Sequence, residues 1–153
     1  MREVVFGRVA ELIDHYQLHQ TGTLVKLTPL EDMFPIRYEP LARMGILGAC
    51  HPPKSGEVSA ANPARILLDD GMPDRLERVV YAHEVGHGIL GHRGELAFGP
   101  MSEWFSGKNE REAWEVAAML LVPREALMPY VEASTIAAIC EVPEELVHLA
   151  ARL

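Results

Sequence analysis

The feature that most constrains the fold of this sequence is the run PDRLERVVYAHEVGHGILGH at residues 73–92. Its apolar and histidine residues recur at steps of three and four, which is the spacing of one face of a helix. Pro73 suits a first helical turn, and the acids that follow suit the positive end of a helix dipole. The stretch GHRG at residues 91–94 then stops the pattern. We therefore expect one long helix here.

Two histidines lie four residues apart in this helix, with an acid directly after the first (HEVGH, residues 83–87). His83 and His87 share one face, one turn apart, so both imidazoles can reach a single cation such as zinc. Glu84 is about 100° round the helix from His83. Beside a metal, its carboxylate can take a proton from water and pass it to a leaving amine. The alternative interpretation is a solvated helix face that carries two histidines.

Glycines and a further histidine follow the same motif. Gly86 and Gly88 each cost about 1 kcal/mol of helix stability relative to alanine. We interpret them as a sign that backbone or substrate approaches closely at this turn, with helix–helix packing as the alternative. His92 is interpreted as a helix-end histidine that favours the C-terminal dipole, rather than as a ligand.

A catalytic zinc keeps three protein ligands and one open position, so a third ligand is needed. The candidates Glu110, Glu112 and Glu115 lie in a second predicted helix at 108–121, whose apolar face comprises Ala113, Ala117, Leu120 and Leu121. Glu110 shares that face, where a carboxylate costs energy unless it is paired. We therefore prefer Glu110, with Glu112 as the alternate. Two histidines and one glutamate suit zinc and do not exclude manganese or iron.

The rest of the chain predicts an α+β fold in which helix dominates. The expected elements are a helix at 3–17, a strand within TGTLVKLTPL (21–30), loops and short strands at 35–63, a strand at ARILLDDG (64–71), short helices near 124–131 and 133–140, and a last helix opened by Pro143. We find no linker or repeat. The expectation is a single domain over 1–153, with a catalytic core at 60–123 and a helical tail at 124–153.

Composition narrows the classes of function. Net charge is −8, from 22 acids and 14 bases, without the basic cluster of a nucleic-acid binder. An acidic chain can still act on a DNA-binding protein. No run reaches the roughly 18 apolar residues of a membrane span, and no signal peptide is evident. Cys50 and Cys140 lack a CxxC spacing and are interpreted as small buried hydrophobes. We expect a cytoplasmic protein.

Three segments in order resemble the ImmA/IrrE metallopeptidases of bacteria and their mobile elements. ARILLDD precedes the active-site helix, ERVVYAHEVGHGILGH carries the histidines, and EREAWEVAAMLLVP resembles the second family signature, E-x-x-A-N-x-F-A-A-x-L-L-M-P. On that pattern Glu110 takes the position of the ligand glutamate and Pro123 that of the closing proline. The resemblance covers about residues 60–153 and implies a small zincin-like domain.

The sequence departs from the signature at two positions. Trp114 stands where the family usually has Asn, and Val116 where it usually has Phe. Trp114 lies four residues after Glu110, so we expect it beside the metal, where it would line an apolar substrate pocket or crowd the site. The tail TIAAICEVPEELVHLAARL resembles the helical tail of the family, and its acids argue against phosphate contact.

The resemblance implies a zinc-dependent endopeptidase, with Zn²⁺ (or Mn²⁺) on His83, His87 and Glu110 and with Glu84 as catalytic base. It also implies the substrate, a helix-turn-helix repressor cleaved at one site to release phage, mobile-element or stress genes. The alternatives are a non-catalytic, metal-stabilised protein-binding module and a toxin–antitoxin component. Two features stay open: the oxyanion donor, for which Tyr81, Tyr130 and His148 are candidates, and loop 94–107 with Trp104 and Phe105, either a substrate-binding flap or a plain surface loop.

Overall fold

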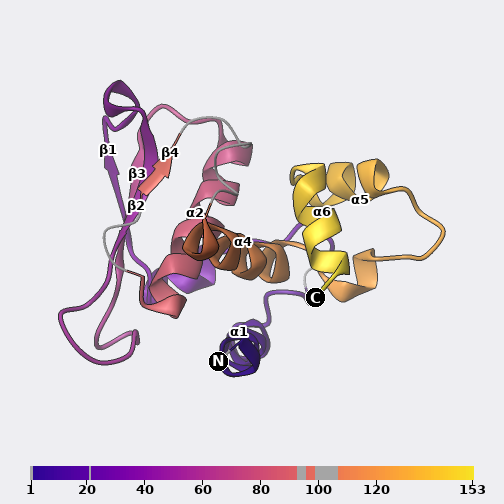
Figure 1. Cartoon of the computed structure of the whole chain (residues 1–153), viewed down its shortest axis with the longest axis horizontal. Helices are drawn as coiled ribbons and strands as arrows, with labels where there is room; N and C mark the ends of the chain where they lie inside the picture. The colour runs from indigo at the N-terminus through magenta and orange to yellow at the C-terminus, as the bar shows by residue number, and fades with distance from the viewer. Residues whose placement is uncertain (1, 21, 93–95, 99–106) are drawn as a thin grey trace.

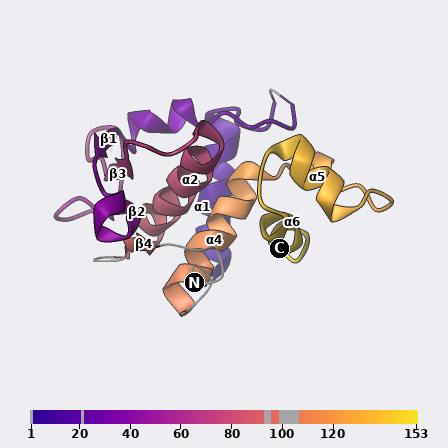
Figure 2. The same cartoon turned by 90° about the horizontal axis from the view of Figure 1, so that it is seen from above.

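The computed structural model of the chain describes residues 2–20, 22–92, 96–98 and 107–153. A small β-sheet lies on one side of α2 (Asp74–Leu90) and α4 (Lys108–Leu121) lies on the other, as Figure 1 and Figure 2 show from two directions. Helix α1 (Arg2–His15) packs against both helices. The predicted fold class is confirmed: α+β, rich in helix, with a short sheet packed on the helix that carries HEVGH.

The sheet has four strands in the order β1-β3-β2-β4. They are β1 (Ile36–Glu39), β2 (Ile46–His51), β3 (Arg65–Asp69) and β4 (Leu96–Phe98). Strand β1 pairs parallel to β3, whereas β2 pairs antiparallel to β3 and β4. A Cβ atom on Gly48 of β2 would lie 2.8 Å from Val80 Cγ1 and 3.1 Å from Glu84 Cγ. The glycine therefore lets the sheet press against the turn of α2 that bears Glu84.

Helix α2 starts and stops where the sequence predicts. Pro73 precedes it in an extended conformation, and acids occupy its first turn. Gly91 ends it in the left-handed region (φ 74°), where its N–H bonds back to Gly88 and His87 carbonyls. This left-handed turn reverses the chain, and the backbone N–H of His92 donates to the His87 carbonyl at 3.0 Å. His92 therefore lies against the last turn of α2.

The C-terminal part is a small group of helices on the far side of α4 (Figure 1). It contains η3 (Arg124–Ala126), α5 (Ala133–Cys140) and α6 (Glu144–Ala151), and α6 packs on α4. The short helix predicted near 124–131 is wrong in extent, because only the 3₁₀ turn η3 forms there. Pro129 disfavours the helical conformation in the residue before it and offers no N–H.

The strand predicted within residues 21–30 is also wrong. Residues 24–27 carry no strand, and Thr28–Asp32 form the 3₁₀ helix η1, which Pro29 helps to start. Val25 and Leu27 are nonetheless buried. Their apolar side chains therefore indicate that this segment is buried in the core, and not that it pairs in the sheet. In the predicted loop region 35–63, strands β1 and β2 form together with the short helix η2 (Ala42–Met44).

The core runs between the sheet, α2, α4 and the tail, and Trp114 is the largest fully buried side chain among the described residues. Cys50 and Cys140 are buried free thiols, as predicted. Burial raises the pKa of the Cys50 thiol to about 12, with a smaller contribution from Glu84. Among the described helices, none combines the length and the apolar character needed to cross a bilayer.

Candidate metal centre

The HEVGH segment lies in the interior of the molecule. His83, Glu84 and His87 are all 0% exposed, on the part of α2 that is enclosed between the sheet and α4. Their ligand atoms lie within 4.8 Å of one another. Three buried titratable side chains in so small a volume need compensating partners. The alternative of a solvated helix face with two histidines is thereby excluded.

Glu110 brings those partners from the first turn of α4. Its Oε2 lies 2.9 Å from Nε2 of His83, and its Oε1 lies 3.1 Å from Nε2 of His87. The two Nε2 atoms are 3.0 Å apart, and the rings meet edge to face at 86°. The Nε2 atoms of His83 and His87 and the two carboxylate oxygens of Glu110 therefore converge on one point. Glu110 is the most accessible of these groups, with a side chain 15% exposed.

Close packing of two helices makes this convergence possible. A Cβ atom on Gly86 would lie 2.6 Å from the carbonyl oxygen of Ala113 in α4, so only glycine lets the backbones come this near. A Cβ on Gly88 would lie 2.8 Å from the ring of Phe34 and 3.3 Å from Cys50 Sγ. The close approach expected at these glycines is therefore made by the α4 backbone at Gly86 and by core side chains at Gly88, through helix–helix and helix–core packing.

The donor set fits a divalent cation. Two atoms bound to a tetrahedral zinc at about 2.0–2.1 Å lie about 3.3 Å apart, close to the separations seen here. Burial lowers the pKa of His83 to about 4, so its ring is neutral and has a lone pair at neutral pH. Burial raises the pKa of Glu110, but hydrogen bonds with His83 and His87 outweigh it and bring the pKa to about 2. One carboxylate thus faces the neutral ring of His83 and the Nε2 atom of His87.

Trp114 lies directly against this cluster, as its spacing from Glu110 predicts, but it does not line a substrate pocket. Its ring stacks on that of His83 with centroids 4.1 Å apart and planes at 29°, and its side chain is 0% exposed. A fully buried ring lines no open substrate pocket. Trp114 instead forms a wall that fixes the plane of the His83 imidazole.

The other two acids of α4 lie outside the cluster, as predicted. Glu112 Oε2 is 3.6 Å from Nε2 of His92, and Glu115 is partly exposed. Sequence reasoning interpreted His92 as a helix-end histidine and missed its contact with the cluster. Its Nδ1 lies 3.0 Å from Nδ1 of His87. The signal was the glycine at position 91, since a left-handed C-cap turns the next residue back over the last helical turn.

The structure places the three candidate oxyanion donors away from the cluster. The Tyr81 hydroxyl donates to the Phe34 carbonyl at 2.8 Å. Tyr130 is 98% exposed between η3 and α5, and His148 pairs with Glu144 on α6 at 3.4 Å. Trp104 and Phe105, the aromatic residues of the predicted flap, lie outside the described residues. Inside the predicted 94–107 loop, residues 96–98 form strand β4.

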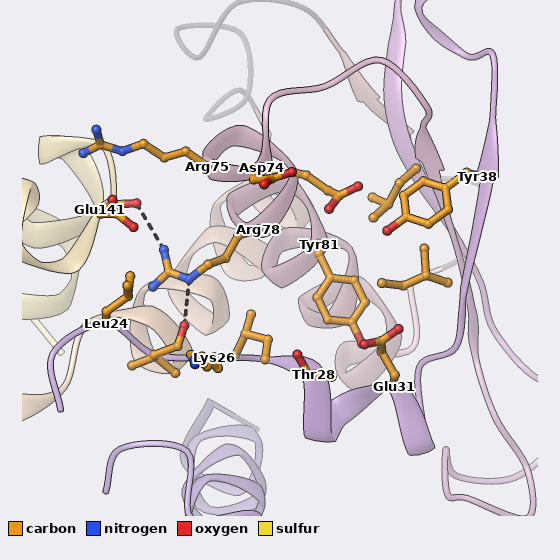
Figure 3. Close-up of a pocket in the computed structure, with 15 residues that line it drawn as sticks. Leu24, Lys26, Thr28, Glu31, Tyr38, Asp74, Arg75, Arg78, Tyr81 and Glu141 are labelled. Atoms are coloured by element: carbon orange, nitrogen blue, oxygen red, sulfur yellow. Dashed lines mark hydrogen bonds between the residues drawn. The ribbon is translucent and has the colours of Figure 1, made fainter. Parts of the chain in front are cut away.

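A separate cleft of about 510 Å³ opens beside the first turns of α2 (Figure 3). Arg78 and Tyr81 line it, and the residues of the His/Glu cluster do not. The guanidinium of Arg78 donates to the carbonyls of Val25, Cys140 and Glu141 at 2.7–3.1 Å. A cation already committed to three carbonyls is a structural link and not an anion site.

Comparisons with known proteins give a match to a protein family. The sequence model of the Peptidase_M78 family, described as the IrrE N-terminal-like domain, matches residues 34–151. That range is more than half of the chain and includes the sheet, both helices of the cluster and the tail. No curated protein and no solved structure matches the chain significantly.

Proposed function

The chain belongs to the IrrE N-terminal-like family of metallopeptidases, and from this premise we propose that it is a zinc-dependent endopeptidase. His83, His87 and Glu110 are the proposed ligands, and Glu84 is the proposed catalytic base. The observation that carries the proposal is the approach of both Nε2 atoms to the two Glu110 oxygens, at 2.9 and 3.1 Å, inside the core. The neutral ring of His83 and the ionised carboxylate of Glu110 supply a lone pair and a negative charge, both of which a dication requires.

Zinc bound there would act as a Lewis acid that polarises the scissile carbonyl and acidifies the attacking water. Glu84 follows His83 directly and lies with its carboxylate near both histidines. It would take one proton from the water as the water oxygen bonds to the carbonyl carbon. It would give that proton to the amide nitrogen as the carbon–nitrogen bond breaks. The proton that Glu84 takes from water is the one it gives to the leaving nitrogen, so the reaction needs no other acid.

The proposed substrate is a cytoplasmic helix-turn-helix repressor that is cut at a single site. The resemblance of the three signature segments to the ImmA/IrrE family is the argument for this class of substrate. Charge is consistent with it, because a chain of net charge −8 attracts a basic DNA-binding protein and repels nucleic acid.

Glu84→Gln tests the proposal, because it preserves the shape of the base and removes its ability to take a proton. We expect the variant to keep its zinc and to lose cleavage by a factor of about 10²–10⁴. Purified wild type, Glu84→Gln and the control Glu115→Gln would be incubated with candidate helix-turn-helix repressors from the same source, with fragments identified by mass spectrometry.

Two outcomes would contradict the proposal. If Glu84→Gln derepresses the target genes in cells as well as the wild type does, the protein acts by binding, and the metal-stabilised module becomes the better account. If the wild type binds no zinc when zinc is supplied, the metal centre itself is wrong.

A further inference from the structure

We infer that His92, backed by Glu112, is a positioning residue that selects the tautomer in which His87 can bind a metal through Nε2. This inference rests on the proposed function, since it concerns the same metal centre. It adds two residues that are not ligands and that do not touch the reacting atoms.

The contacts form a chain from the cluster toward the surface. Nδ1 of His87 lies 3.0 Å from Nδ1 of His92, with ring centroids 5.2 Å apart. Nε2 of His92 lies 3.6 Å from Oε2 of Glu112, which in turn has Lys108 at 3.7 Å. The His92 side chain is only 11% exposed, so its ring is held in place by the core. Each nitrogen of both imidazoles therefore faces a defined neighbour.

Two neutral imidazoles that meet through Nδ1 atoms share one proton, and its position decides what the outer nitrogens carry. When Nε2 of His87 is a ligand, its proton is on Nδ1 and donates to Nδ1 of His92. The proton of His92 is then on Nε2, facing the carboxylate of Glu112. That carboxylate favours an N–H directed at it, although at 3.6 Å the contact is electrostatic rather than a full hydrogen bond.

Without a metal, the same chain favours the opposite arrangement. Oε1 of Glu110 lies 3.1 Å from Nε2 of His87 and accepts a hydrogen bond if that nitrogen is protonated. Nδ1 of His87 then accepts from Nδ1–H of His92. Metal binding thus reverses the hydrogen bond between the two rings and moves the His92 proton to the side of Glu112. Each ring carries one proton before and after, so the pair stays neutral.

Among the described residues, His83 has no contact chain like the one that joins His87 to His92 and Glu112. Within the described part of the chain, Nδ1 of His83 has no hydrogen-bond partner, and its ring is held by stacking on Trp114. His83 is therefore oriented by stacking on Trp114, and His87 by its contacts with His92 and Glu112. Loss of the polar chain should leave the fold intact and weaken the metal site, as the outer partners of ligand histidines do.

His92→Phe, His92→Asn and Glu112→Gln test the inference, with Glu115→Gln on the same helix as the control. His92→Phe removes the acceptor and keeps a ring, whereas the Oδ1 atom of Asn can occupy the place of Nδ1. Zinc affinity would be measured by competition with a chromophoric chelator, and folding by thermal unfolding of the metal-free proteins. We expect affinity to fall about 10–100-fold in His92→Phe, less in Glu112→Gln, and by only a few-fold in His92→Asn. Glu115→Gln should match the wild type.

Ring ¹⁵N NMR supplies a readout that a purely structural histidine would not move. His92 in the wild type should carry its proton on Nδ1 when metal-free and on Nε2 when zinc-loaded. Unchanged affinity in His92→Phe, or one His92 tautomer in both states, overturns the inference while the metal centre stands. Wild-type protein that binds no zinc overturns the proposed function, and the inference with it.

Discussion

At the scale of single residues, Glu110 and Glu112 differ by two positions in the sequence and by their whole environment in the fold. Glu110 faces two buried imidazoles, and Glu112 faces His92 with a side chain 34% exposed. We predict about one zinc per chain in the wild type, loss of the metal in His87→Ala and Glu110→Gln, and retention of weaker binding in Glu112→Gln. Metal content by mass spectrometry checks this. Zinc kept by Glu110→Gln and lost by Glu112→Gln would move the third ligand to Glu112.

The low pKa of His83 predicts how the metal-free protein responds to acid. Unfolded, this histidine takes a proton near pH 6.5, and in the folded protein only near pH 4, because it is buried. Between these values the unfolded state binds more protons, so the free energy of unfolding falls as pH falls. The depressed pKa of Glu110 extends this loss to lower pH.

Denaturant unfolding with chelator at pH 7.5 and pH 5 measures that effect. We expect the wild type to lose about 2 kcal/mol from His83 alone between these values. A His83→Gln variant should lose less over the same range. A wild-type stability that does not change between pH 7.5 and pH 5 would contradict a buried neutral histidine.

Sequence reasoning correctly identified the residues whose place on a helix face follows from helical spacing. The spacing of His83 and His87 and the apolar face that includes Glu110 predicted that these side chains would meet, and the structure brings them together. Their roles as ligands stay predictions. Helical spacing predicted that Trp114 lies beside the cluster, but its stacking on His83 depends on the packing of two helices and could not be predicted. Gly91 marked the turn after α2, but the contact of His92 with His87 was not predicted.

At the scale of elements, the packing of α2 on α4 depends on Gly86. Gly86→Ala would place a methyl group 2.6 Å from the Ala113 carbonyl oxygen, and backbone on both sides cannot yield locally. We predict a loss of about 1–3 kcal/mol in stability together with weaker zinc binding, because α4 and Glu110 would move outward. Thermal unfolding and chelator competition measure the two effects.

Gly7→Ala on α1 is the matched control for that variant. No described atom lies within 4 Å of where its Cβ would be, so alanine should be neutral or stabilise the helix by up to about 1 kcal/mol. Equal stability in Gly86→Ala and Gly7→Ala would show that the helices can separate without cost, against the packing described.

Helices were easier to predict than strands for a physical reason. Helix α2 and helix α4 satisfy their hydrogen bonds within one segment, so spacing, Pro73 and Gly91 were enough to bound α2. A strand depends on a partner elsewhere in the chain. The parallel pairing of β1 with β3 joins residues 36–39 to 66–69, and Val25 and Leu27 resemble strand residues but meet no sheet edge. The order β1-β3-β2-β4 had no sequence signal.

At the scale of the whole molecule, Arg78 ties three distant segments together. From α2 it donates to carbonyls at Val25 before η1 and at Cys140 and Glu141 at the end of α5. Figure 3 shows its bond to Glu141. The predicted division into a core at 60–123 and a tail at 124–153 makes this residue the link between the parts. We predict that Arg78→Leu lowers stability by about 2 kcal/mol, since it leaves the part-buried carbonyls of Val25 and Cys140 without their donor.

Arg75→Leu provides the comparison, because Arg75 is exposed one turn earlier on the same helix. For a chain of this size, the loss in Arg78→Leu corresponds to a fall in Tm of about 4–8 °C, and Arg75→Leu should stay within about 2 °C of the wild type. Hydrogen exchange should also rise in α5 for Arg78→Leu alone. Identical melting of the two variants would mean that the tail is held by α6 and α4 without help from Arg78.

The division of the cluster between α2 and α4 has a consequence for how the protein is made. During synthesis, the ribosome releases His83 and His87 well before Glu110, and the closeness of the three depends on Gly86 lying against Ala113. A nascent chain that ends after α2 offers zinc only two imidazoles, one turn apart. Two such ligands bind zinc weakly and exchange it readily. With the proposed ligand set, zinc binding follows the docking of α4 on α2, and a chain truncated after α2 lacks the complete site.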